Sequence, residues 1–359
     1  MPINLEKIYK NKKVFITGHT GFKGSWLISW LHILGANIKG YALEPENSFD
    51  LYNLIKGNNL CESIIADIRN KKRIEKEILD FKPDFIIHLA AQPLVRLAYE
   101  KPSETIEVNA TGTAYVLDAV RKLEQPCVVI LITTDKVYEN LELNYAYKED
   151  DRLGGYDLYS ASKACSELII NSYRNSFFNV NDYSAHKKDI ASARAGNVIG
   201  GGDWSKDRII PDVIKALKND ETIIVRNPSA VRPWQHVLEP LSGYLHLGAK
   251  MYKNPGEYTG AWNFGPQLED NLTVDGLVKQ VINLWGTGTY HTPEQLNQPH
   301  EANLLMLDIT KTVNNLDWSP KMNAAVAIEK TIKWYKQYFN DKSSIVNYTF
   351  RSIEEFNEL

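Results

Sequence analysis

The chain has 359 residues, of which 43% are hydrophobic and 24% charged, an ordinary composition for a globular protein. Its formal net charge is −3 and its basic residues form no stripe, so a nucleic-acid partner is not expected. No leader-like or membrane-spanning apolar run is visible, so we expect a cytoplasmic protein. Cys61, Cys127 and Cys165 lack metal-ligand spacing, which predicts reduced thiols and no metal site.

Strands and helices alternate along the first half of the chain. Short apolar, β-branched runs predict strands over residues 13–17, 37–42, 64–66, 85–89, 128–132 and 190–194. Helical periodicity predicts helices over residues 25–34, 71–80, 103–122 and 157–178. This alternation is typical of an α/β protein with a doubly wound, Rossmann-type parallel sheet.

The second half has a different character, with more prolines and loops from Gly200 onward. Its periodicity predicts a short strand over 222–225 and helices over 211–218, 237–251, 273–284 and 324–338. We therefore predict a dinucleotide-binding domain over residues 1–195 and a smaller C-terminal substrate-binding lobe over residues 196–359. The stretch at about 234–264 is compatible with a return to the first domain.

A glycine-rich turn follows the first predicted strand. Gly18, Gly21 and Gly24 form a Gly-x-x-Gly-x-x-Gly pattern that also contains Thr20 and Phe22. Glycines let the backbone approach a pyrophosphate, and the N-terminus of the following helix offers N–H donors. The pattern also suits a simple tight turn, but its place between a strand and a helix favours a dinucleotide site.

Other residues bear on which dinucleotide is bound. Asp67 and Ile68 follow the third strand, where a carboxylate can accept a hydrogen bond from an adenine amino group; an exposed loop aspartate is the alternative. Glu44 ends the second strand with no arginine directly after it, which favours NAD over NADP. His19 and Lys23 lie within the glycine loop, and His19 is interpreted as a polar contact rather than a catalyst.

The end of the fourth strand has small residues that leave room for a flat cofactor. These are Leu89, Ala90 and Ala91, for which close packing is the competing explanation. Gln92 and Arg96 follow on a loop at the carboxyl edge of the predicted sheet. Ligands bind at this edge in such sheets, so both residues are candidate substrate contacts.

One predicted helix carries a Tyr-x-x-x-Lys pair. Tyr159 and Lys163 are four residues apart, so both lie on one face of the helix. A lysine there can hold a phenol ionised, and an ionised phenol is a base for a sugar hydroxyl. Ser160 and Ser162 between them are interpreted as filler. Such pairs also occur in ordinary helices, so the interpretation depends on what meets the pair at the sheet edge.

The strand over residues 128–132 leads into a second polar cluster formed by Thr134, Asp135 and Lys136. At the carboxyl edge of the sheet, this acid and this amine would reach the same substrate as the tyrosine. The alternatives are a surface pair in a turn for Asp135 and Lys136, and a hydroxyl that satisfies the backbone for Thr134.

In their order along the chain, these motifs resemble those of the extended short-chain dehydrogenases/reductases that act on nucleotide sugars. The shared features are the glycine pattern, Asp67-Ile68, Leu89-Ala90-Ala91, Asn109, Thr133-Thr134 and Tyr159-x-x-x-Lys163. Four runs resemble the CDP-D-glucose 4,6-dehydratase branch more closely: GHTGFKGSW (18–26), TTDKVY (133–138), AGNVIGGGDW (195–204) and RPWQHV (232–237). The dTDP-glucose branch has Asp-Glu where this chain has Asp135-Lys136.

The resemblance implies an NAD-dependent lyase that converts CDP-D-glucose to CDP-4-keto-6-deoxy-D-glucose and water. Tyr159, held as phenolate by Lys163, would take the O4 proton while hydride leaves C4. Asp135 would protonate the departing O6 hydroxyl, and Thr134 would orient the sugar. Lys136 would either remove the C5 proton as a neutral base or stabilise the enolate as a cation.

The resemblance further implies that the second lobe binds the nucleotide sugar. Guanidinium groups suit a diphosphate, so Arg208 and Arg232 are candidate contacts, although each also fits a solvated surface arginine. Asn197 and, in a late loop, His300 complete the expected substrate set. A homodimer or tetramer and a role in deoxysugar synthesis for lipopolysaccharide O-antigen are also implied.

Two other functions remain open on the sequence alone. A nucleotide-sugar 4-epimerase shares the fold, the NAD site and the Tyr/Lys pair but needs no acid to expel O6, so Asp135 and Lys136 argue against it. A non-catalytic NAD-sensing protein would usually lack the Tyr/Lys pair. The residues do not identify the nucleotide base or the acceptor for ribose hydroxyls near Glu44.

Overall fold

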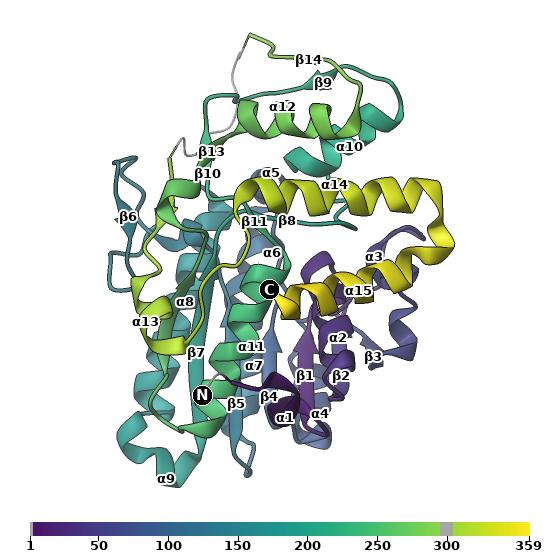
Figure 1. The fold of residues 1–359 in the computed structure, drawn as a ribbon. Coiled ribbons are helices and arrows are strands. Elements are labelled where there is room, and N and C mark those ends of the chain that lie inside the picture. The colour runs from purple at the N-terminus through teal and green to yellow at the C-terminus, as the bar shows by residue number, and fades with distance from the viewer. Residues whose placement is uncertain (1–2, 295–303) are drawn as a thin grey trace.

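The computed structural model describes residues 3–294 and 304–359, and its centre is a parallel sheet of seven strands (Figure 1). The order is β3-β2-β1-β4-β5-β7-β12, and each neighbouring pair is parallel. These strands are β1 Lys13–Thr17, β2 Asn37–Ala42, β3 Glu62–Ile65, β4 Phe85–His88, β5 Cys127–Ile132, β7 Lys188–Ala195 and β12 Gly260–Phe264. The strand order reverses beside β1, so the predicted doubly wound, Rossmann-type α/β fold is confirmed.

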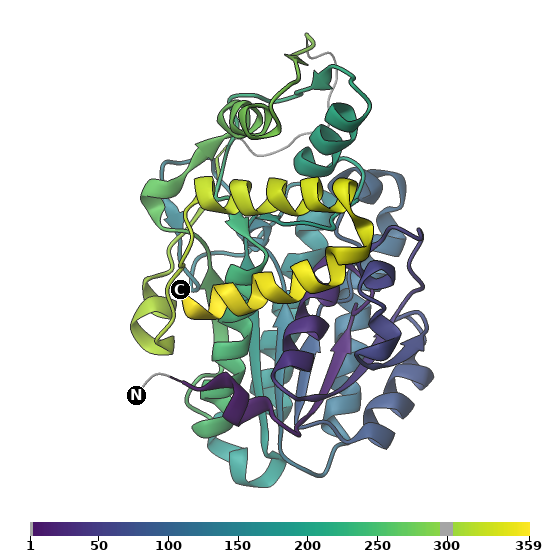
Figure 2. The ribbon, with the colours of Figure 1, turned by 45° about the vertical axis from the view of Figure 1, so that its right-hand side comes forward.

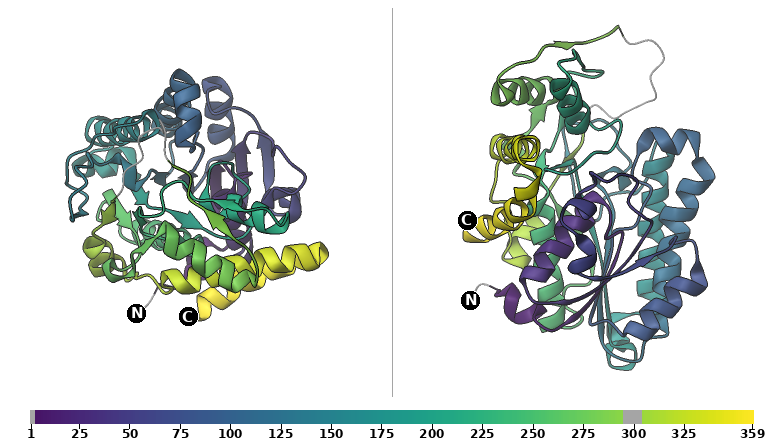
Figure 3. Two further views of the ribbon diagram at one scale, coloured as in Figure 1. Left: turned by 90° about the horizontal axis from the view of Figure 1, so that it is seen from above. Right: turned by 90° about the vertical axis from the view of Figure 1, so that its right-hand side faces the viewer.

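Helices cover both faces of this sheet. In side view, α2, α11 and α15 lie on one side of it and α4, α7 and α8 on the other (Figure 3). The helices are α1 Leu5–Tyr9, α2 Phe22–Ile33, α3 Leu51–Leu54, α4 Lys71–Phe81, α5 Val95–Glu100, α6 Pro102–Ile106, α7 Gly112–Arg121, α8 Leu158–Phe177, α9 Tyr183–His186, α10 Ile209–Lys218, α11 Leu238–Lys253, α12 Val274–Trp285, α13 Thr310–Leu316, α14 Ala324–Asn340 and α15 Ile345–Glu358. Within the described ranges, no helix combines the length and apolar character that crossing a membrane requires.

Alternating side chains on the strands build two separate cores. On β1, Val14 and Ile16 join the core that contains α2 and α11, whereas Phe15 joins the core under α4 and α7. On β5, Ile130 belongs to the first core and Val129 to the second. A strand buried on both faces reads as a continuous apolar run, which explains why short apolar runs predict these strands well.

The helix predicted over residues 103–122 is correct in place but interrupted in form. A π-helical turn over Glu107–Thr111 joins α6 to α7. Within it, Asn109 Nδ2 donates to Gln92 O (3.1 Å) and to Ser162 Oγ (2.8 Å). Turns of this kind are frequent at functional sites, and helical periodicity does not reveal them because the flanking residues keep their apolar spacing.

The second half of the chain contributes both to the sheet and to a cap above it. β12 extends the sheet beside β7, while α14 and α15 form a helical hairpin that packs on α2 (Figure 2). The helix α15 is not among the predicted helices, and Phe356 anchors it against Trp30. Short strand pairs connect the loops: β6 Ala146–Tyr147 with β15 Met306–Leu307, β8 Val198–Ile199 with β11 Gln235–His236, β9 Ile223–Ile224 with β14 Tyr290–His291, and β10 Val231–Arg232 with β13 Leu272–Thr273.

Candidate active site

A cavity of about 1590 Å³ opens at the carboxyl edge of the sheet. The glycine loop, the residues after β4 and β5, the start of α8 and loops from the second half of the chain line it. Ligands of doubly wound sheets bind at this edge, near the reversal of strand order. In the described part of the chain, no group of three or more His, Cys, Asp or Glu side chains could hold a metal ion.

The glycine loop is shaped by steric demands that the sequence pattern anticipates. Gly18 has φ +76°, and a Cβ there would lie 2.8 Å from the Ala90 nitrogen. A Cβ on Gly24 would lie 2.1 Å from the Gly18 carbonyl oxygen. Gly21 differs, because its Cβ would meet only the Gly18 oxygen at 3.5 Å. Gly21 lines the cavity and begins α2 without a side-chain cap, so a diphosphate fits beside the free N–H groups.

The predicted adenine contact is already engaged by a neighbour. Asp67 lines the cavity, but its carboxylate accepts hydrogen bonds from Arg69 Nε (2.9 Å) and from the Arg69 backbone nitrogen (2.8 Å). These hydrogen bonds hold the pKa of Asp67 below its usual value against the effect of burial. Ile68 is buried against Gly112. Both Glu44 and Glu46 are exposed, but only Glu46 belongs to the cavity lining, so the structure does not support Glu44 as the acceptor for ribose hydroxyls.

The remaining predicted cofactor residues also line the cavity. Thr20 Oγ1 donates to the Leu43 carbonyl (2.8 Å), which ties the glycine loop to the end of β2. The residues beyond β4 follow the same wall, and the Ala90 nitrogen donates to Thr17 Oγ1 (3.1 Å). Phe22, Leu89, Ala90 and Ala91 all belong to the lining. The predicted set is thus gathered at one wall, although its contacts with a cofactor stay a prediction.

The polar cluster after β5 is folded into a short 3₁₀ turn over Asp135–Val137. Thr134 caps this turn by accepting from the Lys136 nitrogen, and its hydroxyl donates to Asp135 Oδ1 (2.8 Å). Asp135 is only 1% exposed, which rules out a surface pair. Its Oδ2 has no hydrogen-bond partner among the described residues and faces Gly196, whose added Cβ would lie 3.0 Å away. Lys136 Nζ is 3.9 Å from Asp135 Oδ1.

The Tyr-x-x-x-Lys pair projects from the first turns of α8 into the same cavity. Burial raises the pKa of Tyr159 to about 12, although a hydrogen bond with Thr134 works in the opposite direction. Burial lowers the pKa of Lys163 to about 8. Lys163 Nζ donates to the Ile132 carbonyl at the end of β5 (3.0 Å), which joins α8 to the segment that carries Asp135. The tyrosine, the lysine and the acid therefore meet at one strand end.

Ser160 and Ser162 are not filler, so that interpretation is wrong. Both are buried: Ser160 binds the helix cap Asp157, and Ser162 accepts from Asn109. Asn109 Oδ1 also accepts from the Gln92 nitrogen (2.8 Å), so Ser162 and the π-helical turn fix α8 against the loop after β4, whereas Ser160 binds the cap at the start of α8. The sequence signal for these structural roles was the presence of serines on the helical face that is turned toward the protein interior.

The predicted substrate contacts occupy the cavity lining with different partners. The Gln92 side chain is bonded to α6, where its Nε2 donates to Thr105 Oγ1 (2.9 Å). Arg208 donates to Asp203 Oδ2 (3.0 Å), and Arg96 Nε lies 3.7 Å from Asp207 Oδ1. Asn197 and Arg232 also line the cavity, whereas His300 lies outside the described residues. The substrate roles of these residues remain predictions.

Lys23 joins this cluster, although the sequence analysis gives it no role. It lies on the first turn of α2, lines the cavity, and places Nζ 5.9 Å from the Tyr244 ring centroid. Burial, followed by the positive charges of Arg208 and Lys163, lowers the pKa of Lys23 to about 7, while Asp135 opposes this shift. The position of Lys23 between two glycines of the predicted phosphate-binding loop was the feature of the sequence that could have indicated this role.

This chain is similar to several known proteins. A family model described as GDP-mannose 4,6 dehydratase matches residues 15–331. A CDP-glucose 4,6-dehydratase from Salmonella typhimurium is 44% identical over 341 residues, which are 95% of each protein. A CDP-paratose 2-epimerase from Salmonella typhi is 27% identical, and the match covers 90% of this chain and 98% of that protein.

Solved structures share the fold at lower identity. A dTDP-glucose 4,6-dehydratase from Streptomyces venezuelae, solved with NAD and TYD bound, has a TM-score of 0.78 at 20% identity, covering 91% of this chain and 98% of that one. A UDP-glucose 4-epimerase from Thermotoga maritima, solved with UDP-glucose, has a TM-score of 0.76 at 17% identity, covering 91% and 99%. The shared fold thus serves both dehydratases and epimerases, so the choice between them must come from the site.

Proposed function

Because this chain belongs to the family described as GDP-mannose 4,6 dehydratase, we propose that it is an NAD-dependent CDP-glucose 4,6-dehydratase. The products would be CDP-4-keto-6-deoxy-D-glucose and water. The 44% identity to a CDP-glucose 4,6-dehydratase over nearly the whole chain supports this substrate. Under this proposal, residues 1–195 mainly hold the cofactor and residues 196–359 mainly hold the nucleotide sugar.

One observation carries the proposal. Asp135 is a buried carboxyl at the strand end, and its Oδ2 has no hydrogen-bond partner in the described part of the chain. An oxygen held in this way can carry a proton and transfer it to a leaving hydroxyl. A 4-epimerase needs no such acid, because its reaction expels no group from C6. The position of Asp135 beside Tyr159 therefore favours dehydration.

The first step concerns the hydroxyl at C4. Tyr159 would take the O4 proton, with Thr134 hydrogen-bonded to the same region of the sugar. Burial alone keeps the phenol neutral, since it raises the pKa of Tyr159 to about 12. The phenolate would therefore depend on positive charge from Lys163, which uses one of its N–H donors on the Ile132 carbonyl. NAD, when bound, supplies the hydride acceptor for C4 and the hydride donor for C6.

The second step removes water across C5 and C6. The new C4 ketone acidifies the C5 proton, which Lys136 would remove as a neutral amine. Asp135 would protonate O6, so the C6–O6 bond breaks and water leaves. The proton held by Lys136 would then return to C5. Tyr159 would release the O4 proton to solvent, and Asp135 would regain a proton from solvent. The alternative role for Lys136, a cation that stabilises the enolate, fits its distance of 3.9 Å from Asp135 equally well.

The residues around the glycine loop fit an NAD diphosphate. Gly21 leaves space on its cavity side, and α2 presents uncapped N–H groups there. Arg208 and Arg232 would neutralise the substrate diphosphate, and Asn197 would add an amide donor. Arg69 already donates to the Asp67 carboxylate. Asp67 would therefore accept a hydrogen bond from the adenine only if its carboxylate bound Arg69 and the adenine together.

The wider assignments are proposals of the same kind. We propose a homodimer built on α8 and the neighbouring helices, working in the cytoplasm on a deoxysugar for lipopolysaccharide O-antigen. The outward surfaces of these helices support the dimer, since Ile106 on α6 and Leu168 and Phe177 on α8 are large, apolar and exposed.

The deciding experiment incubates purified protein and NAD⁺ with CDP-, dTDP-, UDP- and GDP-hexoses. We expect CDP-glucose to give a product that is lighter by one water and whose NMR spectrum shows a 4-ketone and a C6 methyl group. Tyr159→Phe should lower kcat by at least about 100-fold, within the range attributed to positioned acid–base groups. Asp135→Asn should still oxidise C4 but stop before water loss. Recovery of CDP-galactose would favour the epimerase, and unchanged substrate with every hexose would favour the NAD-sensing protein.

A further inference from the structure

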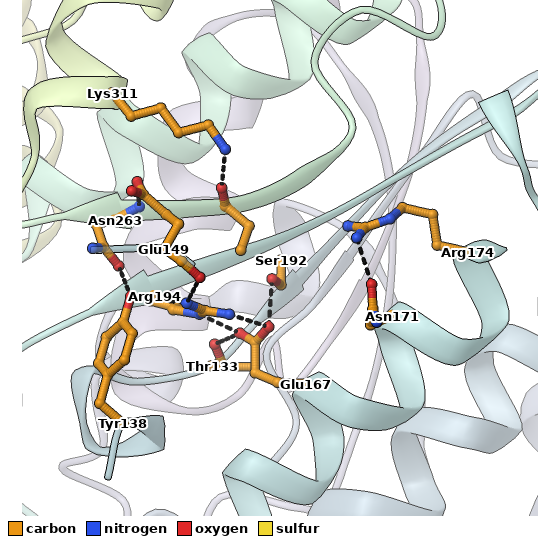
Figure 4. A network of polar contacts seen from close by, with 11 residues as sticks. Thr133, Tyr138, Glu149, Glu167, Asn171, Arg174, Ser192, Arg194, Asn263 and Lys311 are labelled. Atoms are coloured by element: carbon orange, nitrogen blue, oxygen red, sulfur yellow. Dashed lines mark hydrogen bonds and ion pairs between the residues drawn. The ribbon is translucent and has the colours of Figure 1, made fainter. Parts of the chain in front are cut away.

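A buried ion pair lies directly behind the segment that carries the candidate catalytic groups (Figure 4). Glu167 on α8 and Arg194 on β7 are each 3% exposed. Arg194 Nη2 donates to Glu167 Oε2 (2.9 Å) and Arg194 Nε donates to Oε1 (3.0 Å). Such two-point pairing fixes orientation as well as distance. Neither side chain belongs to the described lining of the cavity, so neither can touch a ligand there.

The carboxylate of Glu167 holds the start of the catalytic segment. Thr133 Oγ1 donates to Oε1 (2.5 Å), and Ser192 Oγ donates to Oε2 (2.8 Å). Burial raises the pKa of Glu167, but the charge and hydrogen bonds of Arg194 outweigh burial and leave the pKa below its usual value. Because Thr133 directly precedes Thr134, the position of the carboxylate sets where the end of β5 lies.

The guanidinium of Arg194 holds the far end of the same segment. Its Nη1 donates to the Tyr138 hydroxyl (2.8 Å) and to the Glu149 carbonyl (2.9 Å). The Tyr138 hydroxyl in turn donates to Asn263 Oδ1 (2.7 Å) on β12. Tyr138 terminates the short turn that begins at Asp135. One ion pair is therefore bonded to the residues on either side of the acid.

The pair also places negative charge beside the lysine of the Tyr/Lys motif. Glu167 lies one helical turn beyond Lys163. Burial lowers the pKa of Lys163 to about 8, and Glu167 opposes that effect. From neighbouring elements, Lys23 on α2 and His88 on β4 also interact with this ammonium group. Lys23 repels it, and burial keeps His88 neutral by lowering its pKa to about 3, so Glu167 is the stabilising charge.

We propose that Glu167 and Arg194 are positioning residues of the reaction, which hold both ends of segment 133–138 and set an anion behind Lys163. The inference rests on the proposed function, because it requires that segment 133–138 carries the catalytic groups. A pair that only stabilised the fold would affect unfolding but not the pH dependence of turnover.

The test replaces Glu167 by Gln, which keeps the size and an acceptor oxygen but removes the charge. We expect kcat to fall at least about 10-fold while KM for CDP-glucose changes less than about 2-fold. Since Lys163 would lose its stabilising anion, the alkaline limb of the kcat profile should move to lower pH. An ¹⁵N NMR titration of Lys163 in the same variant should show the same downward shift. If the wild-type protein makes no product, the proposed function is rejected. The titration still tests whether Glu167 raises the pKa of Lys163.

Glu77→Gln is the matched control. Glu77 forms a buried ion pair with Lys39 (2.8 Å) on the far part of the sheet, outside the cavity lining, so this variant should lose stability without a shift in the pH profile. A folded Glu167→Gln enzyme with wild-type kcat and alkaline limb would overturn the inference. If that variant does not fold, Thr133→Val and Tyr138→Phe decide, because both leave the ion pair in place. Thr133→Val removes one contact with Glu167, and Tyr138→Phe removes the contacts of its hydroxyl with Arg194 and Asn263. We expect each to lower kcat about 5-fold; wild-type kcat in both would also overturn it.

Discussion

At the residue scale, the cavity gathers more positive charge than the sequence motifs imply. Lys23 shares it with Lys163 and Arg208, and burial together with this repulsion lowers the pKa of Lys23 to about 7. An amine that is about half protonated near neutral pH takes up the remaining half proton when an anion binds beside it and stabilises its charged form. The diphosphate of a dinucleotide is such an anion, and under the proposed function it would bind at the first turn of α2.

We therefore predict that NAD⁺ binding at pH 7 takes up protons, and that Lys23 accounts for most of that uptake. Calorimetric titrations in two buffers of different ionisation enthalpy measure the number of protons. Lys23→Met should abolish most of the uptake and weaken NAD⁺ binding about 10-fold, in line with the loss of a charge-assisted hydrogen bond. Lys72→Met, at an exposed position on α4, should change neither value. Equal proton uptake by wild type and Lys23→Met would contradict the prediction.

Several site residues could be predicted from the sequence because their spacing encodes a shared face or a strand end. Tyr159 and Lys163 are of this kind, and so is the run after β5. The lowered pKa of Lys23 could not be predicted in this way, since it depends on burial and on Arg208, which lies far away in the sequence. The engagement of Asp67 by Arg69 was equally hidden, because a two-residue spacing carries no rule for pairing in a loop.

At the element scale, periodicity predicted the strands and helices that have one consistent environment. The helix α15 was not predicted, although the residues that it buries, Ile345, Thr349, Ile353 and Phe356, recur at helical spacing. The π-helical turn between α6 and α7 was not predicted either. It contains Asn109, whose side chain donates a hydrogen bond to Ser162 on α8. Short strands such as β8 and β11 were missed as well, because two residues that pair only with a distant loop have no period to detect.

The loop before α2 allows a paired test of what its glycines do. Gly24→Ala should destabilise the fold by about 1–3 kcal/mol, because the new methyl would lie 2.1 Å from the Gly18 oxygen and force the helix away from the loop. Gly21→Ala should cost at most about 1 kcal/mol, as a less favourable helix cap. Urea unfolding without ligand measures both.

The NAD⁺ affinity of these variants provides a second comparison. The methyl of Gly21→Ala opens on the cavity, where a diphosphate must approach the backbone, so we expect NAD⁺ affinity to fall at least about 10-fold. Calorimetric titration gives the affinity. Normal NAD⁺ binding by Gly21→Ala would show that the cofactor does not approach this part of the loop.

At the scale of the whole molecule, a buried carboxylate on α11, which packs on the sheet, binds the segment that leads into the C-terminal helices. Glu239 on α11 is fully buried, and its Oε1 accepts from the backbone nitrogens of Lys321 (2.9 Å) and Met322 (2.7 Å), just before α14. Oε2 has no partner among the described residues. Burial raises the pKa of Glu239 from 4.5 to about 7, although the two N–H groups oppose the shift.

This carboxylate should make global stability depend on pH in a defined direction. Between the unfolded pKa near 4.5 and the folded pKa near 7, the native state binds more protons than the unfolded chain, so the free energy of unfolding falls as pH rises through that window. Glu239→Gln imitates the protonated acid and keeps the acceptor oxygen. The variant should therefore match wild type near pH 4.5 and exceed it by up to about 3 kcal/mol above pH 7.

Urea unfolding of wild type and Glu239→Gln at a series of pH values measures this difference, and subtraction removes the contributions of other titrating groups such as the buried histidines. Glu354→Gln, at an exposed position on α15, should leave the pH dependence unchanged. The sequence could not have indicated this coupling, because Glu239 reads as an ordinary acid in the first turn of a helix and its partners are about 80 residues away. A difference that stays constant with pH would mean that Glu239 remains charged in the folded protein and that the join between α11 and α14 accommodates the charge.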